Sequence, residues 1–125
     1  MKNQLRTAAA AIGLLLAASL PAVSQTQPKQ YDTALTELYG SAAPYTGTLK
    51  LTVSPDGIVR GYYFPSDGTA LFIPVTGGQT GQSIWFDIGN GDMYHVDARV
   101  LDGSIIGTAV THDNAQYTFV AKPES

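Results

Sequence analysis

From Tyr45 onward, hydrophobic and polar residues alternate along the chain in short runs that end at turn residues. Asp-Gly, Asn-Gly and glycine-rich pairs recur about every 11 or 12 residues, which is the spacing of short strands joined by tight turns. The pattern predicts strands near residues 45–53, 58–64, 69–76, 83–88, 93–101, 104–111 and 116–121. We therefore expect an all-β fold: an up-and-down antiparallel meander of about seven to eight strands that curls into a small barrel.

The turn residues also predict which residues face each other across the strands. Pro55–Gly57 suits a three-residue loop, with proline at the start of the turn and glycine in the left-handed position. The same loop at three turns predicts these opposed pairs: Val53 with Val59, Leu51 with Gly61, Leu49 with Tyr63, Tyr63 with Leu71, Gly61 with Ile73, Val59 with Val75, Phe86 with Tyr94, Ile84 with Val96, and Trp85 with His95. All three turns then place apolar residues on one inner face, and this agreement supports the meander.

That inner face can be written out residue by residue from the period-two alternation. Its predicted members are Leu49, Leu51, Val53, Val59, Tyr63, Leu71, Ile73, Val75, Ile84, Phe86, Ile88, Tyr94, Val96, Ala98 and Val100. The last two strands remain open. A two-residue Asp102–Gly103 turn points Ile105, Gly107 and Ala109 inward, whereas pairing with Tyr117 and Phe119 favours Ile106, Thr108 and Val110.

The stretch before the meander has a different pattern. Tyr31, Leu35 and Leu38 recur at i, i+4 and i+7, and Gly40 follows, as at the end of a helix. We expect a short helix over Tyr31–Tyr39 that docks on the sheet, because an isolated helix of two turns is unstable in water. Residues 25–44 would then form a linker with this helix, and residues 45–123 the β domain.

The first residues have the features of an export signal. Lys2 and Arg6 precede an apolar run from Ala8 to Leu20, and small residues allow cleavage before Gln25. The run is too short to span about 30 Å of hydrocarbon as a helix. Residues 1–24 are therefore predicted to be a signal peptide, and the mature protein to be periplasmic or secreted.

Composition narrows the classes of partner. Losing Lys2 and Arg6 leaves five basic residues against ten acidic ones, a net charge of −5. This balance argues against nucleic acid and against anionic membrane surfaces, which both attract basic patches. The chain has no cysteine, so the exported domain is expected to fold around a single core without disulfides.

The outer face of the central strands is unusually apolar for a half-solvated sheet. Exposed apolar residues that lie together usually mark an interaction site. The predicted binding residues are Tyr62, Phe72, Trp85, Met93 and His95. The predicted registers place Tyr62 beside Phe72, and a glycine loop that pairs Val75 with Ile84 would place Pro74 beside Trp85. The same pattern is also consistent with two purely structural roles: aromatic residues pair across strands for stability alone, or the Tyr31–Tyr39 helix covers this face.

His95 lies among charged residues and suggests acid–base chemistry. Asp87 and Asp97 could raise the pKa of the imidazole, with Arg99 nearby, but a solvated charge cluster accounts for the same residues. No nucleophile motif and no calcium-loop spacing accompanies them. We predict no metal and no cofactor, and the protein is expected not to be an enzyme.

The segments GTLKLTVSPDGIVRGYY and YTFVAKP, with the glycine-punctuated strands between them, resemble small exported bacterial domains of the avidin-like or lipocalin-like kind. The resemblance spans about residues 45–123 and implies architecture alone, since avidin-type sites use several tryptophans and this chain has only Trp85. The expected function is a non-catalytic binding or interaction module, for an unknown protein or a second copy of the chain. The alternatives are a carrier of a small apolar ligand inside the barrel, which a packed interior would exclude, and a hydrolase that uses His95.

Overall fold

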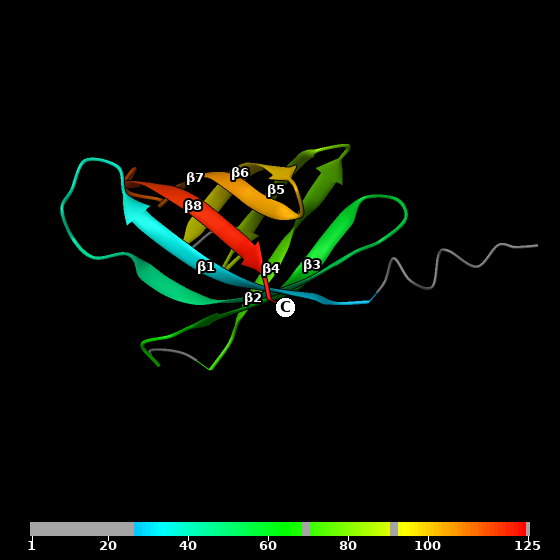
Figure 1. Ribbon diagram of the computed structural model, residues 1–125, viewed down its shortest axis with the longest axis horizontal. Helices are drawn as coiled ribbons and strands as arrows, with labels where there is room; N and C mark the ends of the chain where they lie inside the picture. The colour runs from blue at the N-terminus through cyan, green and yellow to red at the C-terminus, as the bar shows by residue number, and fades with distance from the viewer. Residues whose placement is uncertain (1–26, 69–70, 91–92, 125) are drawn as a thin grey trace, which may run out of the picture.

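The computed structural model describes residues 27–68, 71–90 and 93–124, and it is a closed barrel of antiparallel strands (Figure 1). Each strand pairs with the next in sequence, and the last strand pairs with the first. The eight strands are β1 (Lys29–Glu37), β2 (Tyr45–Val53), β3 (Ile58–Pro65), β4 (Ile73–Thr80), β5 (Ser83–Ile88), β6 (Tyr94–Leu101), β7 (Ser104–Val110) and β8 (Gln116–Pro123). The all-β meander and its closure into a barrel are confirmed.

The predicted helix over Tyr31–Tyr39 is wrong, because Lys29–Glu37 is strand β1. Tyr31 and Leu35 are four residues apart, a spacing that fits both a helix and one face of a strand. The residue that separates the two patterns is Thr33, which lies between them and is also buried, at 4% exposure. β1 pairs with β2 on one side and β8 on the other. It closes the barrel and removes two sheet edges that would otherwise be unpaired.

The first predicted register is confirmed, and the other two are wrong by two residues. Val53 pairs with Val59 as expected. Tyr63 pairs with Ile73 instead of Leu71, and Phe86 pairs with Val96 instead of Tyr94. The other pairs of these strands are displaced by the same two residues. Gly61 pairs with Val75 and Val59 with Gly77. Ile84 pairs with Ala98, and Trp85 pairs with Asp97 in place of His95.

These errors share one physical cause. The connections after β3 and β5 are longer than three residues, so the following strands begin later than expected. A shift of two residues keeps every side chain on its predicted face. The predicted inner face is therefore confirmed except at Leu71, which lies in the β3–β4 connection and is 88% exposed.

The open choice at the end of the chain is resolved in favour of the tight turn. Leu101 pairs with Ser104 across Asp102 and Gly103, which both have positive φ values of 52° and 82°. This is the backbone of the favoured two-residue hairpin. Ile105 and Ala109 are buried, and β8 pairs with them in a register that also buries Phe119.

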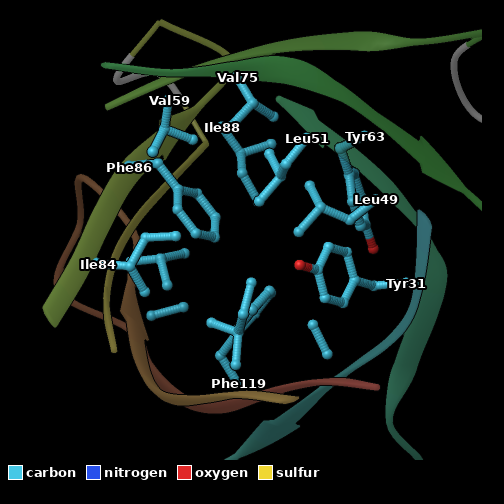
Figure 2. Close-up of a cluster of buried hydrophobic side chains, with 14 of the residues drawn as sticks. Tyr31, Leu49, Leu51, Val59, Tyr63, Val75, Ile84, Phe86, Ile88 and Phe119 are labelled. Carbon is cyan, nitrogen blue, oxygen red and sulfur yellow. The ribbon is translucent and has the colours of Figure 1, made fainter. Parts of the chain in front are cut away.

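The barrel interior is packed across its middle (Figure 2). Phe86 and Phe119 meet there edge to face, with ring centroids 5.7 Å apart. Not all of the residues on the inner faces of the strands have large side chains. Gly47 leaves room for Tyr63, because a Cβ at position 47 would lie 2.6 Å from the tyrosine hydroxyl. Small and large inner residues thus complement each other, as in other small barrels.

The two ends of the barrel are built differently. One end, which we call the short-turn end, holds the connections 54–57, 81–82 and 102–103 and the place where the chain enters β1. The other, the long-loop end, holds the connections 38–44, 66–72, 89–93 and 111–115. In Figure 1 the β1–β2 connection lies at the left and the β2–β3 turn at the right.

The predicted signal peptide, residues 1–24, and its cleavage site lie outside the described residues. Within the described ranges, no helix has the length and hydropathy needed to cross a membrane.

Candidate functional site

The five residues predicted to form an outer binding patch do not lie in one place. Tyr62 and Phe72 are together, with ring centroids 5.1 Å apart and nearly perpendicular planes. Trp85 lies on Gly78, where a Cβ would be 2.6 Å from the indole ring. The expected neighbour Pro74 instead pairs with Tyr62, four residues or about 13 Å along β4 from Gly78.

A polar row separates these two aromatic groups. Arg60 pairs with Thr76, Thr76 with Asp87, and Asp87 with His95 across β3 to β6. Met93, the fifth predicted residue, lies at the long-loop end, where it lines a cavity. The outer wall of the barrel therefore carries separate small aromatic groups rather than a continuous apolar surface.

His95 is held between two carboxylates on the outer wall. Its Nδ1 lies 2.7 Å from Oδ1 of Asp87, and its Nε2 lies 3.2 Å from Oδ2 of Asp97. The hydrogen bond with Asp87 raises the pKa of His95, with a further contribution from the charge of Asp97 and partial opposition from burial. Both ring nitrogens are occupied by carboxylates, so the imidazole is arranged as one half of an ion pair rather than as a base facing a substrate.

The most organised group of polar side chains lies at the mouth of the long-loop end. Tyr45, Tyr63 and Tyr94 come from the inner faces of three strands and line a cavity of about 410 Å³. Tyr117 of β8 is not among the residues that line this cavity. Its ring packs edge to face against the rings of Tyr45 and Tyr94, at centroid distances of 6.1 and 5.5 Å. The remaining lining residues are Leu35, Pro44, Thr46, Pro65, Ser66, Asp67 and Met93.

Strand alternation explains why the four tyrosines converge. Tyr45 shares its face with Leu49, Tyr63 with Val59, and Tyr94 with Val96, so all point inward. Each also lies near the strand end that opens toward the long loops. The alternation had placed Tyr63 and Tyr94 on the inner face but did not show that they meet. Their meeting depends on the shear of the closed barrel, which a strand-by-strand pattern does not contain.

Burial keeps the phenols of Tyr63 and Tyr94 neutral. It raises the pKa of Tyr94 to about 12, with additional contributions from the neighbouring tyrosines and from the charge of Asp67. Burial also raises the pKa of Tyr63, and the adjacent Thr33 hydroxyl partly opposes the rise. That buried hydroxyl makes no hydrogen bond of ordinary geometry to any described residue.

A second cavity, of about 560 Å³, opens at the short-turn end. Its inner wall is mostly aliphatic, including Leu51, Ile84 and Ile105. Tyr31 also lines it and points into the barrel from the side opposite Ile84 (Figure 2). Lys29 and Gln79 lie among the polar lining residues. The packed layer around Phe86 and Phe119 lies between the buried parts of the two ends.

The charges are distributed unequally between the two ends. The five described basic residues are all within three residues of a strand terminus at the short-turn end: Lys29, Lys50, Arg60, Arg99 and Lys122. By the same measure, the described acidic residues are divided between the ends: Glu37, Asp67, Asp87, Asp97 and Asp113 lie at the long-loop end, and Asp32, Asp56, Asp102 and Glu124 lie at the short-turn end. Among the described residues, the long-loop end has no lysine or arginine.

Metal binding finds no support in the described part of the chain, which contains no group of three or more His, Asp or Glu side chains placed to hold an ion. No model of a known protein family matches this chain. No curated protein matches it either. The candidate site therefore rests on geometry alone, that of the cavity lined by Tyr45, Tyr63 and Tyr94, which we call the tyrosine mouth.

Proposed function

We propose that this protein is a non-catalytic binding protein that acts after export and takes a small ligand into the tyrosine mouth, the cavity lined by Tyr45, Tyr63 and Tyr94. The observation that supports this proposal is the convergence of those side chains, backed by Tyr117, around an open cavity of about 410 Å³. Small-molecule sites are typically concave and largely apolar, with a few polar groups that set orientation. The mouth of a small barrel is a common place for such a site.

The geometry favours binding over catalysis. The raised pKa values of Tyr63 and Tyr94 keep these two phenols neutral at ordinary pH, so they donate and accept hydrogen bonds without acting as bases. His95, the histidine that suggested acid–base chemistry, lies on the outer wall in contact with two carboxylates. The interior is packed around Phe86 and Phe119, which favours a ligand at the mouth over a carrier cavity in the middle of the barrel.

The test is a ligand screen read by NMR on protein with isotope-labelled tyrosine rings. Neutral compounds such as phenol and charged small molecules are added singly, and the ring signals are assigned with Tyr→Phe variants. We expect shifts at Tyr45, Tyr94 and Tyr117, with Tyr62 on the outer wall as the internal control. Shifts confined to Tyr31 would place the ligand at the short-turn end, and shifts confined to Tyr62 would place it on the outer wall. Either result contradicts the proposal.

A second candidate function is self-association through the exposed side chains of Leu71 and Phe72, which precede β4. Leu71 is 88% exposed, and the exposed Phe72 packs on Tyr62 of the adjacent strand. Exposed apolar residues of this kind favour a protein contact. Sedimentation of the wild type and of Phe72→Ser over a range of concentrations tests it. Loss of a concentration-dependent species in the variant supports this contact, and a wild type that is monomeric at every concentration excludes it.

A further inference from the structure

The chemistry of the tyrosine mouth selects among classes of ligand. The inference rests on the proposed function, because it concerns the same cavity. The wall combines tyrosine rings with the apolar side chains of Leu35, Pro44 and Met93, and it includes one carboxylate, Asp67. A ligand that matches this wall has apolar surface and a charge opposite to that of Asp67.

An anionic ligand does not match the mouth. Among the described residues, no lysine or arginine lies at this end of the barrel, and five acidic residues lie within three residues of its strand termini. The charge of Asp67 reaches the phenols, since it contributes to the raised pKa of both Tyr63 and Tyr94. The same field that disfavours a phenolate disfavours any other anion placed between these hydroxyls.

A bare metal ion is also a poor match. Hard cations require several oxygen ligands, usually including more than one carboxylate. Asp67 is the one carboxylate in the lining of this cavity, and its other walls are rings and aliphatic groups. A cation that brings its own apolar shell needs no such ligand set. It gains from contact with aromatic faces and from one nearby carboxylate.

We propose that the tyrosine mouth binds an organic cation of the alkylammonium class. The alkyl groups would contact the rings of Tyr45 and Tyr94 and the side chain of Met93, and Asp67 would supply the counter-charge. The acidic residues around the long-loop end would also raise the encounter rate with a cation, in a manner that decreases with salt. The short-turn end carries all five described basic residues beside four acidic ones, so it has no excess of negative charge and provides no comparable field for a cation.

The experiment compares choline with 3,3-dimethylbutan-1-ol, a neutral compound of the same shape. We expect choline to bind about tenfold more tightly by calorimetry, a factor within the range for a cation on aromatic rings with a nearby carboxylate. Choline should also shift the ring signals of Tyr45 and Tyr94. Asp67→Asn should remove most of the preference for choline and leave the affinity for the alcohol unchanged.

Asp113→Asn is the matched control, because Asp113 is an acidic residue of the same end that accepts a hydrogen bond from Thr111 and does not line the cavity. An equal loss of choline affinity in both variants would overturn the role of Asp67. Equal affinities for choline and the alcohol would overturn the cation inference and leave the proposed function intact. If phenol alone shifts the tyrosine signals, the cation inference likewise fails by itself. If no compound shifts them, both fail.

Discussion

The two ends of this barrel are made from the same strands but differ in nearly every property that matters for binding. The short-turn end has connections of two to four residues, a mostly aliphatic inner wall, and all five described basic residues around it. The long-loop end has connections of five to seven residues, inward-facing tyrosines and an acidic surround. Both ends open into cavities, so the presence of a cavity does not distinguish them.

The comparison of the two ends shows that the role of a residue depends on two things: whether it faces inward, and where along the strand it lies. Alternation selects which residues face inward, and it operates identically along the whole strand. What an inward-facing residue does depends on its level in the barrel. In the middle, Phe86 and Phe119 are fully buried and stabilise the fold, whereas Tyr45, at the start of β2, keeps 48% of its surface exposed. An amphipathic ring at a strand end can therefore contact a ligand as well as the core.

The largest expected effect comes from removing the layer that separates the two ends. Phe86→Ala should lower the free energy of unfolding by about 3–5 kcal/mol, the range for a buried aromatic residue that leaves a cavity. Phe72→Ala, an exposed aromatic of the long-loop end, is the control and should change it by less than about 1 kcal/mol. Urea unfolding of both variants makes the comparison. A small loss for Phe86→Ala would mean that the middle of the barrel is not packed.

The next largest effect is expected on how the stability of the folded protein depends on pH, through Tyr94 in the tyrosine mouth. The folded-state pKa of Tyr94 is about 12, above the ordinary value of 10.0. In the unfolded chain this phenol loses its proton at lower pH, so the folded state holds more protons between pH 10 and 12 and stability falls as the pH rises through that window. Tyr94→Phe should reduce this loss. Thermal unfolding at several alkaline pH values measures it, with Tyr62→Phe on the outer wall as the control.

Absorbance titration of the phenols provides an independent check on the same residue. The wild type should show a component that ionises near pH 12, and this component should be missing in Tyr94→Phe. If Tyr94 instead ionised at its ordinary value, the mouth would be more hydrated than its burial indicates, and the contrast between the two ends would weaken.

The smallest effect is expected on the outer wall, at His95. Its contact with Asp87 raises the imidazole pKa above the ordinary 6.5, so the ion pair stabilises the fold below the unfolded pKa and this contribution is lost as the pH rises through the folded one. The His95 side chain is 50% exposed, so solvent screening keeps the contribution small. Asp87→Asn should move the NMR-measured pKa of His95 downward. An unchanged pKa would show that the pair does not form in solution.

The sequence by itself determined the fold class and, except at Leu71, the inner face of β2 to β6. Period-two alternation and turn residues are local signals, and they were sufficient for the meander and for the residues that it buries. Even the two wrong registers, at Tyr63 and at Phe86, preserved the faces, because each shift was two residues. At Asp102–Gly103 the sequence left two arrangements open, and the positive φ values of both residues decide for the two-residue turn.

Only the tertiary structure decided what β1 is and where the binding surface lies. Tyr31 and Leu35 fit a helix locally, but their segment forms a strand because the barrel needs a partner for both β2 and β8. The predicted outer patch is divided by the polar row that includes Thr76, since the short 81–82 connection pairs Trp85 with Gly78 and not with Pro74. Closure of the barrel gathers tyrosines that are up to 72 residues apart in sequence, Tyr45 and Tyr117, into one mouth. Such long-range placement depends on closure and shear, which no local pattern along the chain specifies.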